Sequence, residues 1–221
     1  VFPHCSYFSI FINIIMESIS YAEVCQMAHN GAKVIHPRAV EIAMSANVPM
    51  YIKSTFSDAP GTLITNETTE NAGADITLST AAGVANLSGL TQFRVTLNPN
   101  DFTAGQNLFV DLAQAGISVG CLNLSEKEAM FAVVAEDQVK TVTVLDNAGV
   151  QYDINEGCGK VTVVGSGMRG VPGVMARFVA ALAGNNIKIY QTVDSDNTIS
   201  AIVKDECLSD AVNALHAAFN L

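Results

Sequence analysis

The stretch KVTVVGSGMRGVPGVMARFVAALAGNNIKIYQTVDSDNTISAIV, residues 160–203, decides the fold of this 221-residue chain. It begins with an apolar strand at 160–164, followed by a glycine-rich loop at 165–173. A helix follows, because apolar residues recur at helical spacing, and Gly184-Asn185-Asn186 ends it. Two further strands, 187–193 and 198–203, surround a polar turn at 194–197 and predict a hairpin.

A closing helix is predicted at 208–219, with Ala211, Val212, Leu215 and Ala218 on one face. The order strand, helix, strand, strand, helix predicts an antiparallel sheet with two helices on one face. A sixth element, a closing strand, is either borrowed from elsewhere in the chain or missing.

The same order of elements occurs once more upstream, so the chain contains an internal duplication. A strand is predicted at 90–97, and a helix follows it and ends at Gly116. Two strands at 117–124 and 129–135, a helix at 139–149 and a closing strand at 150–154 complete the copy. The fold class is therefore α+β, with two βαββαβ units.

Composition limits the possible partners. Apolar residues make up 49% of the chain and charged residues 14%, which is typical of a packed globular protein. Eleven basic and 21 acidic residues give a formal charge of −10 without a basic cluster, so we expect no nucleic acid partner. Five scattered cysteines without a CxxC pair indicate neither a zinc site nor a disulfide framework, and favour a cytoplasmic location.

The first fifteen residues, VFPHCSYFSIFINII, form an atypical N-terminal segment. Its apolar part, residues 7–15, is shorter than the about 20 residues of a membrane-spanning helix, and no basic region precedes it. A signal peptide or anchor, a buried strand, and translated sequence upstream of a true start at Met16 remain the alternatives. We expect no membrane partner.

The loop GSGMRGVPG, residues 165–173, formally matches the dinucleotide pattern GxGxxG. The strands after it form a hairpin, whereas a dinucleotide site needs a crossover to a parallel strand and an acidic residue about 20 positions on. We therefore expect no nucleotide here. Free N–H groups at a helix N-terminus can equally hold the carboxylate of a small amino acid.

Residues 19–65 resemble the C-terminal part of the aspartate kinase catalytic domain and its exit into the regulatory region. Four motifs occur in that family's order and spacing: Gly31-Ala32-Lys33-Val34, His36-Pro37-Arg38-Ala39, Ser54-Thr55-Phe56 and Pro60-Gly61-Thr62-Leu63-Ile64. The second copy is similar to the family's last ACT domain through residues 163–168, 172–174 and 215–219. The resemblance covers residues 17–221.

The resemblance implies a domain organisation. Residues 16–70 would be the tail, or stub, of the amino-acid kinase domain and a linker, residues 80–156 the first ferredoxin-like ACT domain, and residues 157–221 the second. The parent enzyme phosphorylates the side-chain carboxylate of aspartate with ATP and Mg²⁺, the first step towards lysine, threonine and methionine. The family's Lys-Phe-Gly-Gly-Thr-Ser segment does not occur in these 221 residues. We therefore expect no catalytic residue, metal or cofactor in this chain, and no activity of the chain alone.

The resemblance also implies allosteric feedback by a pathway amino acid, namely lysine, threonine or meso-diaminopimelate. The effector would bind where the strand-helix loop of one ACT domain meets the second strand of a neighbour. Carried over by position, its contacts are Asp101, Thr103, Ala104, Gly105, Asn123, Ser125, Asn186 and Ile187. Residues 100–105, Asn-Asp-Phe-Thr-Ala-Gly, replace the family's Asp-x-Pro-Gly turn, which leaves the effector open.

Structural roles compete with these assignments. Asp101 is equally explained as the N-cap of its helix, and Asn186 as a turn residue that follows a helix. His36 is better explained as a capping residue than as a base, because no nucleophile or paired carboxylate lies near it in the sequence.

Three functions remain for the whole chain. The first is a regulatory fragment that dimerises through its ACT domains and binds a pathway amino acid, with a full-length kinase subunit as a candidate partner. The second is part of an active kinase whose catalytic segment is supplied elsewhere. The third is a dimerising remnant without a ligand.

Overall fold

A computed structural model describes residues 16–56, 59–66, 81–101, 103–166, 168 and 170–221. The alternatives for residues 1–15 concern residues outside this set. The elements are β1 (Ser18–Ser20), α1 (Tyr21–His29), α2 (Pro37–Ser45), β2 (Met50–Ile52), β3 (Thr62–Thr65), β4 (Gly83–Thr96), α3 (Ala104–Gln114), β5 (Gly120–Leu124), β6 (Glu128–Val134), η1 (Ala135–Asp137), α4 (Gln138–Ala148), β7 (Tyr152–Val164), α5 (Val174–Gly184), β8 (Gln191–Asp194), β9 (Thr198–Lys204), η2 (Asp205–Cys207) and α6 (Leu208–Phe219).

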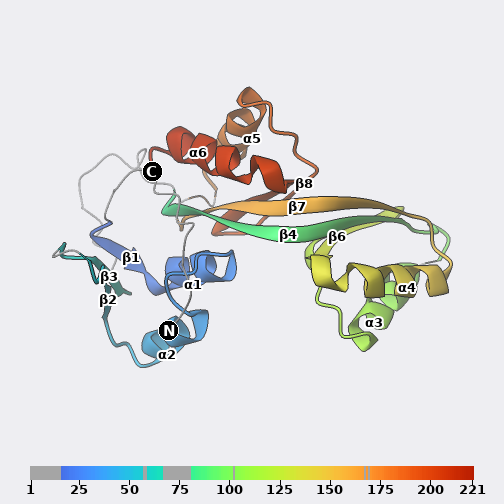
Figure 1. The fold of residues 1–221 in the computed structure, drawn as a ribbon, viewed down its shortest axis with the longest axis horizontal. Helices are drawn as coiled ribbons and strands as arrows, with labels where there is room; N and C mark the ends of the chain where they lie inside the picture. The colour runs from blue at the N-terminus through green and yellow to red at the C-terminus, as the bar shows by residue number, and fades with distance from the viewer. Residues whose placement is uncertain (1–15, 57–58, 67–80, 102, 167, 169) are drawn as a thin grey trace.

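The two copies share one six-stranded sheet with the order β5-β6-β4-β7-β9-β8. Every strand pair in it is antiparallel, which confirms the α+β class and is incompatible with a dinucleotide crossover after β7. The long strands β4 and β7 run through the middle of the molecule and connect its two ends (Figure 1).

The predicted strands 150–154 and 160–164 are one strand, β7, so their prediction as separate elements was wrong. Gly157, with φ 60°, and Gly89 of β4, with φ 73°, adopt left-handed backbone that favours glycine. The register of β4 against β7 shifts beside Gly89. The pairing of β4 with β7 therefore continues past this irregularity, and the expected domain boundary at 156/157 lies inside β7.

The second copy borrows its closing strand. Residues 83–87 of β4, upstream of the first copy, pair with residues 160–164 of β7. The other end of β4 pairs with β6 and with the first residues of β7, and so belongs to the first copy. Each copy therefore has a complete four-stranded sheet only because both long strands are shared.

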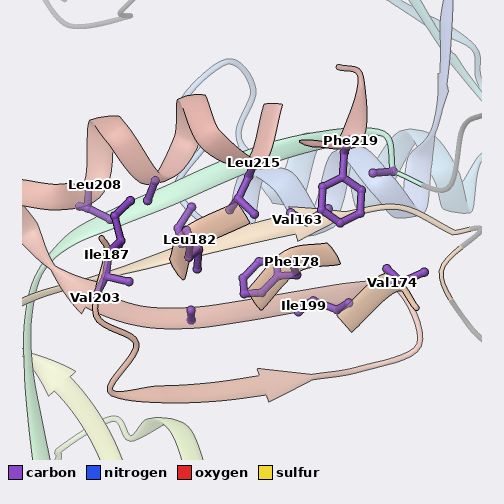
Figure 2. Close-up of a cluster of buried hydrophobic side chains, with 14 of the residues drawn as sticks. Val163, Val174, Phe178, Leu182, Ile187, Ile199, Val203, Leu208, Leu215 and Phe219 are labelled. Carbon is purple, nitrogen blue, oxygen red and sulfur yellow. The ribbon is translucent and has the colours of Figure 1, made fainter. Parts of the chain in front are cut away.

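Each copy buries an apolar core under its own two helices. In the first copy α3 and α4 cover Phe93 and Phe131 of the sheet, and Leu145 of α4 packs into the same core; all three are fully buried. In the second copy α5 and α6 place Phe178 and Leu215 against the strands (Figure 2). The two helix pairs lie on opposite sides of the long strands (Figure 1).

The helix-free faces of the two copies meet between the two helix layers. Side chains alternate across a strand, so Ala132 points away from α3 and α4 and joins Leu90, Cys158 and Ile202 in a separate buried cluster. The amide Nε2 of Gln92 donates to Oε1 of Gln191 at 2.8 Å in this layer. The two copies are therefore packed together as well as joined through shared strands.

Residues 18–65 have their own small sheet, β1-β3-β2, and their own apolar core. The hydroxyl of Ser20 accepts a hydrogen bond from the backbone N–H of Glu23, and the Glu23 carboxylate accepts one from the backbone N–H of Ser20. These two hydrogen bonds form a capping box at the start of α1. Nδ1 of His36 accepts from the backbone N–H of Arg38, and Pro37 occupies the first position of α2. His36 is thus a capping residue, as interpreted from the sequence.

Within the part of the chain that the structure describes, no helix combines the length and the apolar character needed to cross a membrane.

Candidate functional site

A groove of about 330 Å³ lies in the first copy, between the start of α3 and the turn that joins β5 to β6. Its lining residues are Leu97, Pro99, Asp101, Gly105, Gln106, Phe109, Leu124, Ser125 and Glu126. Three of the residues proposed from the sequence, Asp101, Gly105 and Ser125, therefore lie together. A shallower hollow of about 510 Å³ on the surface of α2 is formed by one helix alone and has no converging groups.

Asp101 closes the loop that precedes α3. Its Oδ1 accepts from the hydroxyl of Thr103 at 2.7 Å and from the backbone N–H of Thr103 at 2.9 Å. The N-cap of α3 is Thr103, so the interpretation of Asp101 as the N-cap was wrong. These two hydrogen bonds, the hydroxyl first, lower the pKa of Asp101, and the carboxylate is charged at neutral pH.

The inner wall of the groove is apolar. The ring of Phe109 packs edge-on against Phe131, with centroids 5.9 Å apart, and so anchors the wall to the core. A Cβ on Gly105 would lie 3.3 Å from Leu124 Cδ1, tighter than ordinary packing. A residue without a side chain at 105 therefore lets β5 lie close to α3.

The outer wall is polar and acidic. Backbone and side-chain hydrogen bonds between Ser125 and Glu128, at 2.8–3.1 Å, close the turn after β5. Glu126 follows on the exposed part of this turn. The nine lining residues thus include two carboxylates, Asp101 and Glu126, and no Lys, Arg or His.

The remaining proposed residues are placed differently. Thr103 and Ala104 begin α3, and Asn123 is an exposed residue of β5 beside Leu124. Ile187 is 5% exposed in the core of the second copy, and Asn186, with φ 57°, is the turn residue after α5. Within one chain, the structure does not bring these last two to the groove.

Other lining residues were missed by sequence reasoning. Phe109 was assigned to the helix core, and Leu97 and Leu124 were assigned to strands without a role in a site. The apolar spacing of these residues predicts burial and does not indicate that they border a groove. The one available sequence signal was Gly105, whose missing side chain lets β5 approach α3.

An ACT domain model matches residues 153–217. Aspartokinase 1 of Bacillus subtilis (strain 168) is 38% identical to the chain over 203 residues, which are 92% of this chain and 50% of the relative. This chain belongs to the aspartokinase family. It spans about half the length of the curated relatives it matches.

Two solved aspartokinase structures share this fold. The aspartate kinase of Clostridium acetobutylicum is 22% identical with a TM-score of 0.82, and the match covers 93% of this chain and 49% of that one. The regulatory subunit of aspartate kinase from Thermus thermophilus is 25% identical with a TM-score of 0.57, over 63% of this chain and 99% of the subunit. The aspartokinase fold here consists of two ferredoxin-like ACT domains that follow the end of an amino-acid kinase domain.

Proposed function

We propose that this chain is the regulatory part of an aspartokinase, and that an amino acid bound in the groove between α3 and β5 controls aspartate phosphorylation. The observation that carries the proposal is the groove itself, at the strand-helix loop of the first ACT domain. The likeness to a regulatory subunit of aspartate kinase supports it. The activity under control needs ATP and Mg²⁺, which we assign to the parent enzyme and not to this chain.

The chemistry of the groove favours a diamino acid. Two carboxylates, Asp101 and Glu126, line it and no Lys, Arg or His is among the lining residues, so each carboxylate can stabilise an ammonium group. The start of α3 supplies backbone N–H groups for the ligand carboxylate, and Phe109 and Leu124 contact the methylene chain. Lysine and meso-diaminopimelate carry two ammonium groups, whereas threonine carries one, so we rank threonine below both.

The proposed partners include a second copy of this chain. Strand β5 lies at the edge of the sheet, and Leu122 and Leu124 on it are 45% and 51% exposed. Exposed apolar side chains on an edge strand favour pairing with another chain. A homodimer would then place the groove, whose wall includes Leu124, at an interface where the two domains can move, as allosteric control requires. A full-length kinase subunit and a cytoplasmic location complete the proposal.

Thermal denaturation of the purified chain with lysine, meso-diaminopimelate, threonine or methionine tests this function. A ligand present at 100 times its dissociation constant adds about 2.7 kcal/mol to the free energy of unfolding. For a chain of this size that is about 5–11 °C in Tm. We expect such a shift with lysine or meso-diaminopimelate, and none with ATP plus aspartate.

Asp101→Asn tests the location of the site. Removing one carboxylate from an ammonium contact is expected to weaken binding about tenfold or more. Asp111→Asn is the matched control, because Asp111 is an exposed carboxylate on α3, the helix that follows Asp101, and lies outside the groove. Equal loss of binding in both variants would contradict the site, and no Tm shift with any amino acid would leave the dimerising remnant as the function.

A further inference from the structure

Glu23 connects the kinase-domain segment to the second ACT domain. It lies in the first turn of α1 and is 7% exposed. Its Oε1 accepts from the hydroxyl of Ser166 at 2.8 Å and from the backbone N–H of Ser166 at 3.1 Å. Its Oε2 accepts from the hydroxyl and the N–H of Ser20, at 2.7 and 3.2 Å. Both carboxylate oxygens are therefore used, one inside α1 and one across the domain boundary.

The charge of Glu23 is maintained in this position. Burial raises the pKa of the Glu23 carboxyl, but the hydrogen bonds from Ser20 and Ser166 together lower it by more. The carboxylate that reaches Ser166 is thus an anion at neutral pH, and hydrogen bonds to an anion are stronger than those between neutral groups.

A second contact fixes the other end of α1. Asn30, the residue that ends the helix, accepts at Oδ1 from the hydroxyl of Thr162 at 3.3 Å, and Thr162 shares a 2.9 Å hydrogen bond with Ser200. All three side chains are buried. From Glu23 to Asn30 a helix rises about 10.5 Å, and from Thr162 to Ser166 an extended chain covers about 13 Å. Helix α1 therefore lies along the end of β7, and contacts the strand at Thr162 and the following loop at Ser166.

The strand-helix loops of the two ACT domains thus differ in what they contact. In the first domain Asp101 bonds within the loop and an open groove lies beside it. In the second domain the loop after β7 receives a buried carboxylate at Ser166. We propose that this second loop is a carboxylate-binding site that Glu23 occupies from within the chain. It joins the second ACT domain to the kinase segment and takes no free amino acid.

Amide hydrogen exchange of the full chain without ligand tests the link. Glu23→Gln retains the size of the side chain and removes its charge. We expect the Ser166 amide to exchange about five- to tenfold faster in this variant, with unchanged exchange in the cores around Phe131 and Phe178. Glu17→Gln, at an exposed position, should change nothing. Ser20→Ala removes the hydroxyl that donates to Oε2 and caps α1, but leaves both hydrogen bonds to Oε1, so the Ser166 amide should stay protected.

A double-mutant cycle tests direct contact. Ser166→Asp brings a second carboxylate against Glu23 and should lower Tm, whereas adding Glu23→Gln lets the new amide donate to it and should recover part of the loss. Unchanged exchange at Ser166 in Glu23→Gln, or strictly additive effects in the cycle, would overturn the link.

The consequence for ligand binding rests on the proposed function and is measured separately. Calorimetric titration with the amino acid that stabilises the chain should give one ligand per chain, and two per chain would overturn the assignment of the second loop. Should no amino acid bind, the proposed function fails, while the exchange and mutant-cycle results still decide whether Glu23 holds the loop.

Discussion

Phe131→Ala and Phe178→Ala are each expected to lower the free energy of unfolding by about 3–5 kcal/mol, within a single transition. Phe131 is fully buried in the first ACT domain and stacks on Phe93, with centroids 5.6 Å apart. Phe178 is fully buried in the second. Each substitution removes the packing contacts of the ring and leaves a cavity. The free energy of unfolding therefore falls by more than the transfer free energy of the removed atoms.

The single transition follows from the shared strands. Each long strand contributes to both sheets, so unfolding one domain exposes the strand edges that the other needs. For a chain of this size the loss corresponds to about 6–20 °C in Tm. Calorimetry measures it, with Val139→Ala, at a side chain 75% exposed on α4, as the near-neutral control. Two separated transitions, only one of them shifted by each variant, would show that the domains unfold independently.

Gly31→Ala is expected to lower the free energy of unfolding by about 3 kcal/mol or more, because the kinase segment could no longer lie against the ACT sheet. A Cβ on Gly31 would lie 2.8 Å from the carbonyl carbon of Asn86 in β4, and closer still to its oxygen. The φ of Gly31 is 109°, a conformation that disfavours a side chain. The backbone of β4 cannot move aside, whereas the end of a flexible side chain could.

Gly149→Ala separates the two causes. Gly149 also has a positive φ, 65°, but a Cβ there would meet no atom within 4 Å. Gly149→Ala should therefore lower the free energy of unfolding by only about 1–2 kcal/mol, the cost of placing a side chain on left-handed backbone. Chemical denaturation of both variants gives the comparison. Equal losses would mean that the contact of Gly31 with Asn86 contributes nothing.

Local patterns were read correctly where one segment decides its own structure. The closing helix 208–219 was predicted with its observed bounds, and the helix predicted at 139–149 is observed one residue earlier at Gln138–Ala148. Both have an apolar face at helical spacing, which neighbouring residues alone reveal. The strand predicted at 187–193 is shorter, Gln191–Asp194, because pairing with β9 starts only at Gln191.

The candidate site was recognised in part. Asp101, Gly105 and Ser125 come from segments whose order in the duplicated pattern is visible in the sequence, and the structure brings them to one groove. Asn186 and Ile187 follow the same pattern in the second copy, but Ile187 is required by the core under α5. No sequence pattern indicated that Glu23 contacts the second ACT domain, because its partner Ser166 is 143 residues away.

The sequence by itself determined the duplicated α+β units, the aspartokinase resemblance and the formal charge of −10, since all three depend on residue type and short spacing. Only the tertiary structure decided that residues 83–87 close the second ACT domain, that α1 lies along β7, and which side chains border the groove. The reason is physical. Strand pairing and close approach depend on backbone hydrogen bonds and shape between distant segments, and those interactions leave no periodic trace in either segment alone.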